Sequence, residues 1–191
     1  MRDWGLTEAL APAVPEPAVG VLVVLTAFGG PKLLAAVSIA GSGTALGLGR
    51  VEFHRARRFL VAVALVLSVS ILLKHGLGLP RPPEALMRIP EDGYGFPSGH
   101  ATATAGFVTA LLGTVPGRTR WQVSLGALAV AAIAATRVLL GVHYLPDVLV
   151  GVAVGVGVAT AGLHADRFRP DFTLAGTLGA VVVSLTIWLL G

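Results

Sequence analysis

The chain has 191 residues, of which 54% are hydrophobic and only 13% charged, and its mean hydropathy is +0.82. Soluble globular domains carry about 25% charged residues, so this deficit, together with several long apolar stretches, indicates a polytopic membrane protein. The formal net charge is +4, but the basic residues lie in short clusters between apolar stretches, which argues against a nucleic-acid partner. The absence of cysteine excludes disulfides, a thiolate nucleophile and cysteine-ligated metals.

A helix that crosses the hydrocarbon core needs about 20 mostly apolar residues. Six stretches come close to this length: 31–49, 57–75, 98–115, 121–140, 146–164 and 172–190. The earlier stretch 18–30 has only 13 residues, so we interpret it as a surface or re-entrant helix, with a seventh span as the alternative. The sequence therefore predicts an all-α transmembrane bundle in one domain, 1–191. Its parts are an interfacial segment 1–30, core spans within 31–164 and an extra C-terminal span at 172–190.

The distribution of basic residues predicts the orientation of these spans. The loops on one face carry eight arginines: Arg50, Arg55, Arg57, Arg58, Arg118, Arg120, Arg167 and Arg169. The opposite face carries fewer basic residues: Lys32, Lys74, Arg81, Arg88 and Arg137, with Arg2 as well if the first segment does not span. Because cytoplasmic loops are enriched in Lys and Arg, we expect the eight arginines in the cytoplasm. Three polar motifs, described next, then lie on the extracytoplasmic face of a cell membrane.

The first motif joins Lys74, at the end of an apolar stretch, to Arg81 in the proline-rich loop 76–97. The guanidinium of Arg81 suits two phosphate oxygens at once, whereas the ammonium of Lys74 is a point charge. Taken alone, Lys74 is more typical of a snorkelling lysine that anchors a helix end. The acidic pair Glu91–Asp92 of the same loop is interpreted as solvated, with a role against highly anionic headgroups as the alternative.

The second motif, Pro97-Ser98-Gly99-His100, opens the predicted span 98–115. Ser98 is a natural helix cap, and Gly99 lets a ligand approach the backbone closely. The unpaired amides of the first helical turn and the positive end of the helix dipole form an anion site, with His100 at its rim. An ordinary cap followed by an interfacial histidine explains these four residues equally well.

The third motif places Arg137, His143 and Asp147 around the start of the span 146–164. A helical turn would bring Asp147 to His143, four residues earlier. Pro146 favours a helix that begins there and disfavours helical geometry at Leu145, so an irregular turn between the two is expected. A carboxylate on one ring nitrogen fixes the tautomer and leaves the other nitrogen as a nucleophile. The simpler interpretation makes Asp147 a charge that complements the helix dipole.

Together the three motifs supply cations, two imidazoles and a carboxylate on one predicted face, which favours phosphate chemistry. A metal site is disfavoured because Glu84, Glu91 and Asp92 have no spacing that gathers them with the histidines. A serine acyl hydrolase is also disfavoured, since the sequence lacks Gly-x-Ser-x-Gly and the cations would face a neutral ester.

In order and internal spacing, the three motifs resemble the signature of the type 2 phosphatidic acid phosphatase superfamily, which includes lipid phosphate phosphatases and soluble vanadium haloperoxidases. The resemblance covers residues 74–147, and Thr136 stands where the third motif usually has serine. It implies a nucleophilic His143, oriented by Asp147, and a His100 that protonates the leaving oxygen. The residues that would hold the phosphate are Lys74, Arg81, Ser98, Gly99 and Arg137. No metal or other cofactor is implied.

The sequence thus predicts a multi-pass membrane hydrolase that acts on a lipid phosphate monoester or diphosphate through a phosphohistidine. Phosphatidic acid, phosphatidylglycerophosphate and polyprenyl diphosphates are candidate substrates. Paired imidazoles also predict a bell-shaped dependence of the rate on pH. A lipid phosphotransferase with the same phosphohistidine and a non-enzymatic anion or lipid transporter are the alternatives. Beyond membrane lipids no partner is indicated, and the sequence carries no signal for an oligomeric state.

Overall fold

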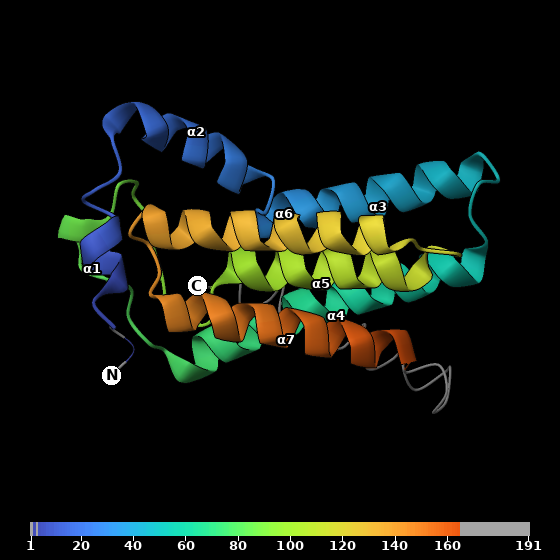
Figure 1. The fold of residues 1–191 in the computed structure, drawn as a ribbon. Coiled ribbons are helices and arrows are strands. Elements are labelled where there is room, and N and C mark those ends of the chain that lie inside the picture. The colour runs from blue at the N-terminus through green and yellow to red at the C-terminus, as the bar shows by residue number, and fades with distance from the viewer. Residues whose placement is uncertain (1, 3, 165–191) are drawn as a thin grey trace.

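The computed structural model describes residue 2 and residues 4–164, and within this part the chain is helical and has no β-strand (Figure 1). The helices are α1 (Leu6–Leu10), α2 (Glu16–Ala27), α3 (Pro31–Gly47), α4 (Phe53–Leu77), the 3-10 helix η1 (Glu84–Leu86), α5 (Gly99–Thr114), α6 (Arg120–Leu139) and α7 (Leu145–His164). This confirms the predicted all-α class. The predicted C-terminal span 172–190 lies outside the described residues.

Three helices, α4, α6 and α7, are long and apolar enough to cross a membrane. They coincide with the predicted spans 57–75, 121–140 and 146–164. Helices α2 and α3 meet these criteria only as a pair, and they are bent by 41° at the short break between them. The stretch 18–30, expected as a surface or re-entrant helix, therefore forms one arm of a bent helix pair. The stretch 98–115 corresponds to α5, which has 16 residues.

Helix α5 lies at the centre of the bundle, where it packs against α3, α4, α6 and α7 (Figure 1). Its closest neighbour is α7, because Gly151 and Gly155 of α7 present no side chain to α5. A Cβ atom on Gly151 would lie 2.9 Å from the Ser98 carbonyl oxygen, and one on Gly155 would lie 2.9 Å from the Gly106 amide nitrogen. The four-residue spacing of these glycines thus serves close helix packing. The contact fixes the first turn of α5 against the first turns of α7.

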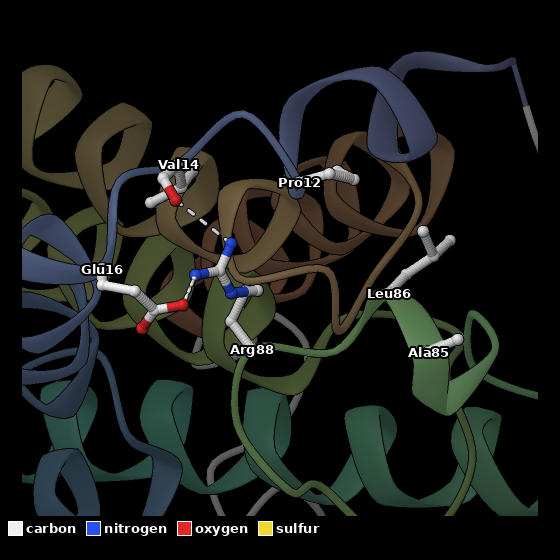
Figure 2. A pocket seen from close by; sticks show the side chains of 6 residues that line it. All are labelled: Pro12, Val14, Glu16, Ala85, Leu86 and Arg88. Atoms are coloured by element: carbon white, nitrogen blue, oxygen red, sulfur yellow. Dashed lines mark hydrogen bonds and ion pairs between the residues drawn. The ribbon is translucent and has the colours of Figure 1, made fainter.

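Arg88, which follows η1, binds the N-terminal segment to the end of the bundle where α4 and α6 end. The Arg88 guanidinium donates to the carbonyl oxygens of Ala11 and Val14, at 3.0 and 3.1 Å, and forms an ion pair with Glu16 at the start of α2. Arg88 also lines a pocket of about 450 Å³ between this segment and η1. Figure 2 shows the Arg88 guanidinium reaching Val14 and Glu16 beside the other side chains that line this pocket. Residues that lie far apart in the sequence therefore meet at this end.

Candidate active site

The three motifs lie at one end of the bundle, where α4 and α6 end and α5 and α7 begin (Figure 1). The α3–α4 and α5–α6 connections, with six of the eight loop arginines, lie at the other end. The remaining two, Arg167 and Arg169, lie outside the described residues. The connectivity of the helices thus separates the motif residues from the arginine-rich loops, as the sequence predicted.

Lys74 is placed by the end of α4. Gly78 stops the helix in a left-handed conformation, with φ of 59°, and its amide donates to the Lys74 carbonyl at 3.1 Å. An L-residue with a side chain rarely adopts this conformation, so glycine suits the position. The Lys74 ammonium donates to the Tyr94 carbonyl at 2.6 Å, and its electrostatic neighbours include Arg81 and Arg137. Lys74 therefore belongs to the polar cluster and is not only a membrane anchor.

Arg81 is held by backbone carbonyls and reaches the predicted nucleophile. Its guanidinium donates to the Asp92 carbonyl at 2.9 Å and to the Val142 carbonyl at 3.2 Å. Its Nη1 atom also lies 3.2 Å from Nε2 of His143. Because a guanidinium has only donors, Nε2 must accept this hydrogen bond, which places the histidine proton on Nδ1.

The Nδ1 atom of His143 faces Asp147, with 3.6 Å between Nδ1 and Oδ2. Both side chains are buried, at 1% and 0% exposure. The carboxylate is positioned by the Tyr144 amide, which donates to Oδ2 at 3.0 Å in the manner of a helix capping box. The two side chains therefore face each other, as predicted. Helix α7 begins at Leu145, one residue before Pro146, and His143 and Tyr144 lie ahead of it, so the turn between His143 and Asp147 is irregular, as expected.

Burial lowers the pKa of His143 to about 4, although the neighbouring Asp147 carboxylate opposes this shift. The positive charges of Arg81, Arg137 and Lys74 lower the pKa further. An imidazole with so low a pKa is neutral near pH 7. Its Nε2 lone pair, which accepts from Arg81 in this structure, can attack once Arg81 donates to another acceptor instead.

Ser98 is the N-cap residue of α5, as predicted, but its hydroxyl makes no capping hydrogen bond. The Ser98 backbone instead ties α5 to α7, since its amide donates to the Asp147 carbonyl at 3.0 Å. The hydroxyl is fully buried and has no hydrogen-bond partner in the described part of the chain. The Ser98 hydroxyl is thus left available to a ligand at the helix N-terminus.

Gly99 is the first residue of α5, and Nε2 of His100 lies near Gly30 at the α2–α3 bend.

Arg137, in the last turn of α6, is 1% exposed and bridges two other segments. Its Nη1 atom donates to the Thr26 hydroxyl of α2 at 3.1 Å, and its Nη2 atom lies 2.9 Å from Oε1 of Glu91. The adjacent Thr136 hydroxyl donates within its own helix to the Ile133 carbonyl, at 2.6 Å. The threonine that replaces the usual serine therefore uses its hydroxyl inside α6.

Glu91 is the main departure from the sequence interpretation, which treated it as part of a solvated loop. Its carboxylate is only 23% exposed and contacts two cations, with 3.6 Å between Oε1 and Arg81 in addition to the Arg137 pair. Burial raises the pKa of Glu91, but Arg137 and Arg81 outweigh this effect and hold the pKa below its ordinary value. The interpretation was wrong because the loop folds back over the arginines.

Two further residues of the site were not predicted, Arg2 and Thr26. The Arg2 guanidinium lies 2.7 Å from Oδ1 of Asp147, on the opposite oxygen from His143. Thr26 contacts Arg137, as described above. Neither residue belongs to a local motif, so no spacing in the sequence indicated them.

In the described part of the chain, helices long and apolar enough to cross a membrane hold three cations beside a buried His–Asp pair, which is an arrangement expected of a helical membrane protein that acts on an anionic group. A model of the PAP2 superfamily matches residues 55–171 of the chain, which include all three motifs. The chain belongs to the PAP2 superfamily.

Two phosphatases are similar to this chain in sequence. The decaprenylphosphoryl-5-phosphoribose phosphatase of Mycobacterium tuberculosis is 36% identical over 126 residues, which cover 62% of this chain and 66% of the relative. The undecaprenyl-diphosphatase of Sulfolobus acidocaldarius is 26% identical over 127 residues, or 62% of this chain and 60% of that protein. The matches thus span somewhat less than two thirds of each relative, and both relatives carry the names of phosphatases.

Two crystal structures have the same fold. The PAP2-type phosphatidylglycerolphosphate phosphatase of Bacillus subtilis superposes with a TM-score of 0.74 and 20% identity, over 88% of this chain and 86% of that one. Aquifex aeolicus LpxE superposes with a TM-score of 0.70 and 21% identity, over 85% and 95% of the two chains. At these identities the likeness concerns the fold.

Proposed function

We propose that this chain is an integral-membrane phosphatase that hydrolyses a lipid phosphate monoester or diphosphate through a phosphohistidine on His143. The observation that carries the proposal is the position of His143. Its Nε2 atom accepts from Arg81, while its Nδ1 atom faces the buried carboxylate of Asp147. A neutral nucleophile beside fixed cations is what transfer of a phosphoryl group needs, because charge spreads over the phosphoryl oxygens in the transition state.

In the proposed first step, Nε2 of His143 attacks phosphorus, an N–P bond forms and the P–O bond to the lipid breaks. Protonated His100 gives its proton to the departing oxygen. The developing charge on His143 is stabilised by Asp147. The phosphoryl oxygens are held by Lys74, Arg81, Ser98, Gly99 and Arg137. The resemblance implies that no metal takes part, so turnover should continue in the presence of a chelator.

In the second step, water attacks the phosphohistidine, the N–P bond breaks and inorganic phosphate leaves. His100, now neutral, accepts the proton from the attacking water, which restores both histidines. An alcohol in place of water would give a phosphotransferase with the same first step. The transporter alternative has no use for the buried His143–Asp147 pair.

The placement of the site also supports a lipid substrate. The site lies at the ends of apolar helices, where a headgroup would lie, and α2 beside it exposes apolar side chains that include Val21, Val24 and Phe28. The two named relatives make polyprenyl-linked phosphates the first substrates to test. We further propose one domain with about six spans and an extracytoplasmic site, supported by the arginine-rich loops at the opposite end.

Release of inorganic phosphate by the purified protein tests the proposal. The panel should hold a polyprenyl phosphate, a polyprenyl diphosphate, phosphatidic acid and phosphatidylglycerophosphate. The His143→Ala variant should release none above background, and the Asp147→Asn variant very little. Full activity of His143→Ala would overturn the mechanism, and transport without release from any substrate would favour the transporter.

A further inference from the structure

The cations that the proposed function assigns to the phosphate already have an anion between them. One oxygen of Glu91, Oε1, lies 2.9 Å from Arg137 and 3.6 Å from Arg81. His100, the proposed acid, also interacts electrostatically with this carboxylate. Glu91 thus occupies the position between two guanidinium groups that phosphoryl oxygens need.

The segment around Glu91 is fixed by the same cations. The carbonyls of Asp92 and Gly93 accept from Arg81, and the Tyr94 carbonyl accepts from Lys74 at 2.6 Å. The segment 91–94 therefore provides acceptors for three of the cations that are proposed to hold the phosphate: Lys74, Arg81 and Arg137. This arrangement offsets the mutual repulsion of three positive charges, of which Arg137 is buried and Lys74 and Arg81 are half-buried.

A carboxylate and a phosphoryl group cannot share this position. Both are anions that need the same guanidinium donors, and at such short range like charges repel strongly. Glu91 remains ionised near neutral pH because the arginines hold its pKa low, so protonation does not remove it. With 23% of its side chain exposed, Glu91 has a route to solvent.

We propose, on the basis of the proposed function, that Glu91 is an internal competitor at the phosphate site, which the phosphoryl group of the substrate must displace. Displacement takes the same free energy from every anion, so the affinity for each falls by a common factor. Phosphodiester headgroups carry one negative charge and bind such a site weakly, whereas a terminal phosphate carries nearly two. Glu91 therefore lowers the occupancy of the site by every anion and leaves the ratio of their affinities unchanged, so the abundant phosphodiesters of a membrane surface, which already bind weakly, stay out of the site.

Calorimetry on the purified full chain in detergent tests this role, with inorganic phosphate and dimethyl phosphate as probes. The Glu91→Gln variant should bind each probe about tenfold more tightly than the unaltered chain, which corresponds to about 1.4 kcal/mol. Asp92→Asn is the matched control. The Asp92 side chain is exposed, and this change removes one negative charge at the residue next to Glu91. Its effect should stay below about twofold.

Unchanged or weaker phosphate binding by Glu91→Gln would overturn the proposal, because Glu91 would then position the arginines and not compete. An equal gain in Asp92→Asn would overturn it as well. Glu91→Asp keeps the charge and serves as a second variant in case Glu91→Gln misfolds. The shorter aspartate side chain reaches the arginines less well, so phosphate affinity should rise by less than in Glu91→Gln. A fall in phosphate affinity would count against the proposal. Because binding needs no turnover, absence of phosphate release from every lipid would refute the proposed function separately.

Discussion

The carboxylate of Asp147 is shared between Arg2 and His143, one on each oxygen. Arg2 lies 2.7 Å from Oδ1, and Nδ1 of His143 lies 3.6 Å from Oδ2. Arg2 also donates to the Pro80 carbonyl at 2.6 Å, and it lies over the rings of Phe96 and Tyr144. The N-terminal segment therefore takes part in orienting the proposed catalytic carboxylate.

Replacement of Arg2 should therefore slow catalysis through the orientation of Asp147, although Arg2 itself is not proposed to contact the substrate. Arg2→Ala leaves Asp147 with its Tyr144 contact but without its strongest partner, so kcat should fall about tenfold with little change in KM. Arg2→Lys should keep much of the activity, because it retains the charge. Steady-state kinetics check this, and a raised KM with unchanged kcat would mean that Arg2 acts on substrate binding instead.

Asp147→Asn should have a larger effect than Arg2→Ala. An amide in place of the carboxylate no longer favours the proton on Nδ1 or stabilises the charge that develops on His143. By analogy with other His–Asp pairs, kcat should fall on the order of 10³-fold or more. Phosphate release under saturating substrate measures this, and a fall of less than about tenfold would contradict the assigned role of Asp147.

The protonation state of His143 gives a prediction that needs no substrate. Since burial and the nearby cations lower its pKa to about 4, the ring should stay neutral as the pH falls from 7 to about 5 and gain a proton only below that. Nitrogen NMR of histidine-labelled protein measures this titration, with the His143→Gln variant to assign the signal. Titration near the ordinary value of 6.5 would contradict the burial of a neutral nucleophile. The acid side of the predicted bell-shaped rate profile should accordingly extend below pH 5.

Arg81 should not tolerate a change that preserves only its charge. Arg81→Lys keeps a cation, but a single ammonium cannot reach both the Asp92 carbonyl and His143, which are held by different nitrogens of the fork. We expect kcat/KM to fall about 10²-fold, equivalent to about 2.7 kcal/mol of lost transition-state stabilisation. Activity close to that of the unaltered chain would show that only charge matters at this position.

The close packing of α7 on α5 can be tested with a pair of glycines on the same helix. A Cβ atom on Gly155 would meet the Thr102 carbonyl and the Gly106 amide, whereas one on Gly157 would meet nothing within 4 Å. Gly155→Ala should therefore destabilise the protein by about 1–3 kcal/mol, and Gly157→Ala should be neutral or slightly stabilising. Thermal unfolding in detergent compares the two. Equal unfolding temperatures would contradict the observed helix contact.

The sequence predicted those parts of the site that depend on local spacing. His143 and Asp147 are four residues apart at the start of α7, so the short turn into this helix is enough to bring their side chains together. The predicted spans that became α4, α6 and α7 follow from apolar length in the same way. These features need no knowledge of the tertiary structure.

The contacts missed by the sequence depend on segments that meet only in the folded bundle. Arg2 contacts Asp147, 145 positions away, and Thr26 contacts Arg137, 111 positions away. Glu91 was misread because an acidic residue in a polar loop is usually solvated, and only the fold of the loop over α6 brings it to Arg137.

Capture of the phosphorylated intermediate shows whether His143 is the residue that takes the phosphoryl group. Purified protein is mixed with a radiolabelled lipid phosphate, quenched in alkali within milliseconds to preserve phosphohistidine, and digested for mass spectrometry. One labelled peptide is expected, with the phosphoryl group on His143, and no labelled peptide is expected from the His143→Ala variant. Label on another residue, or phosphate release by His143→Ala at the rate of the unaltered chain, would contradict this role of His143.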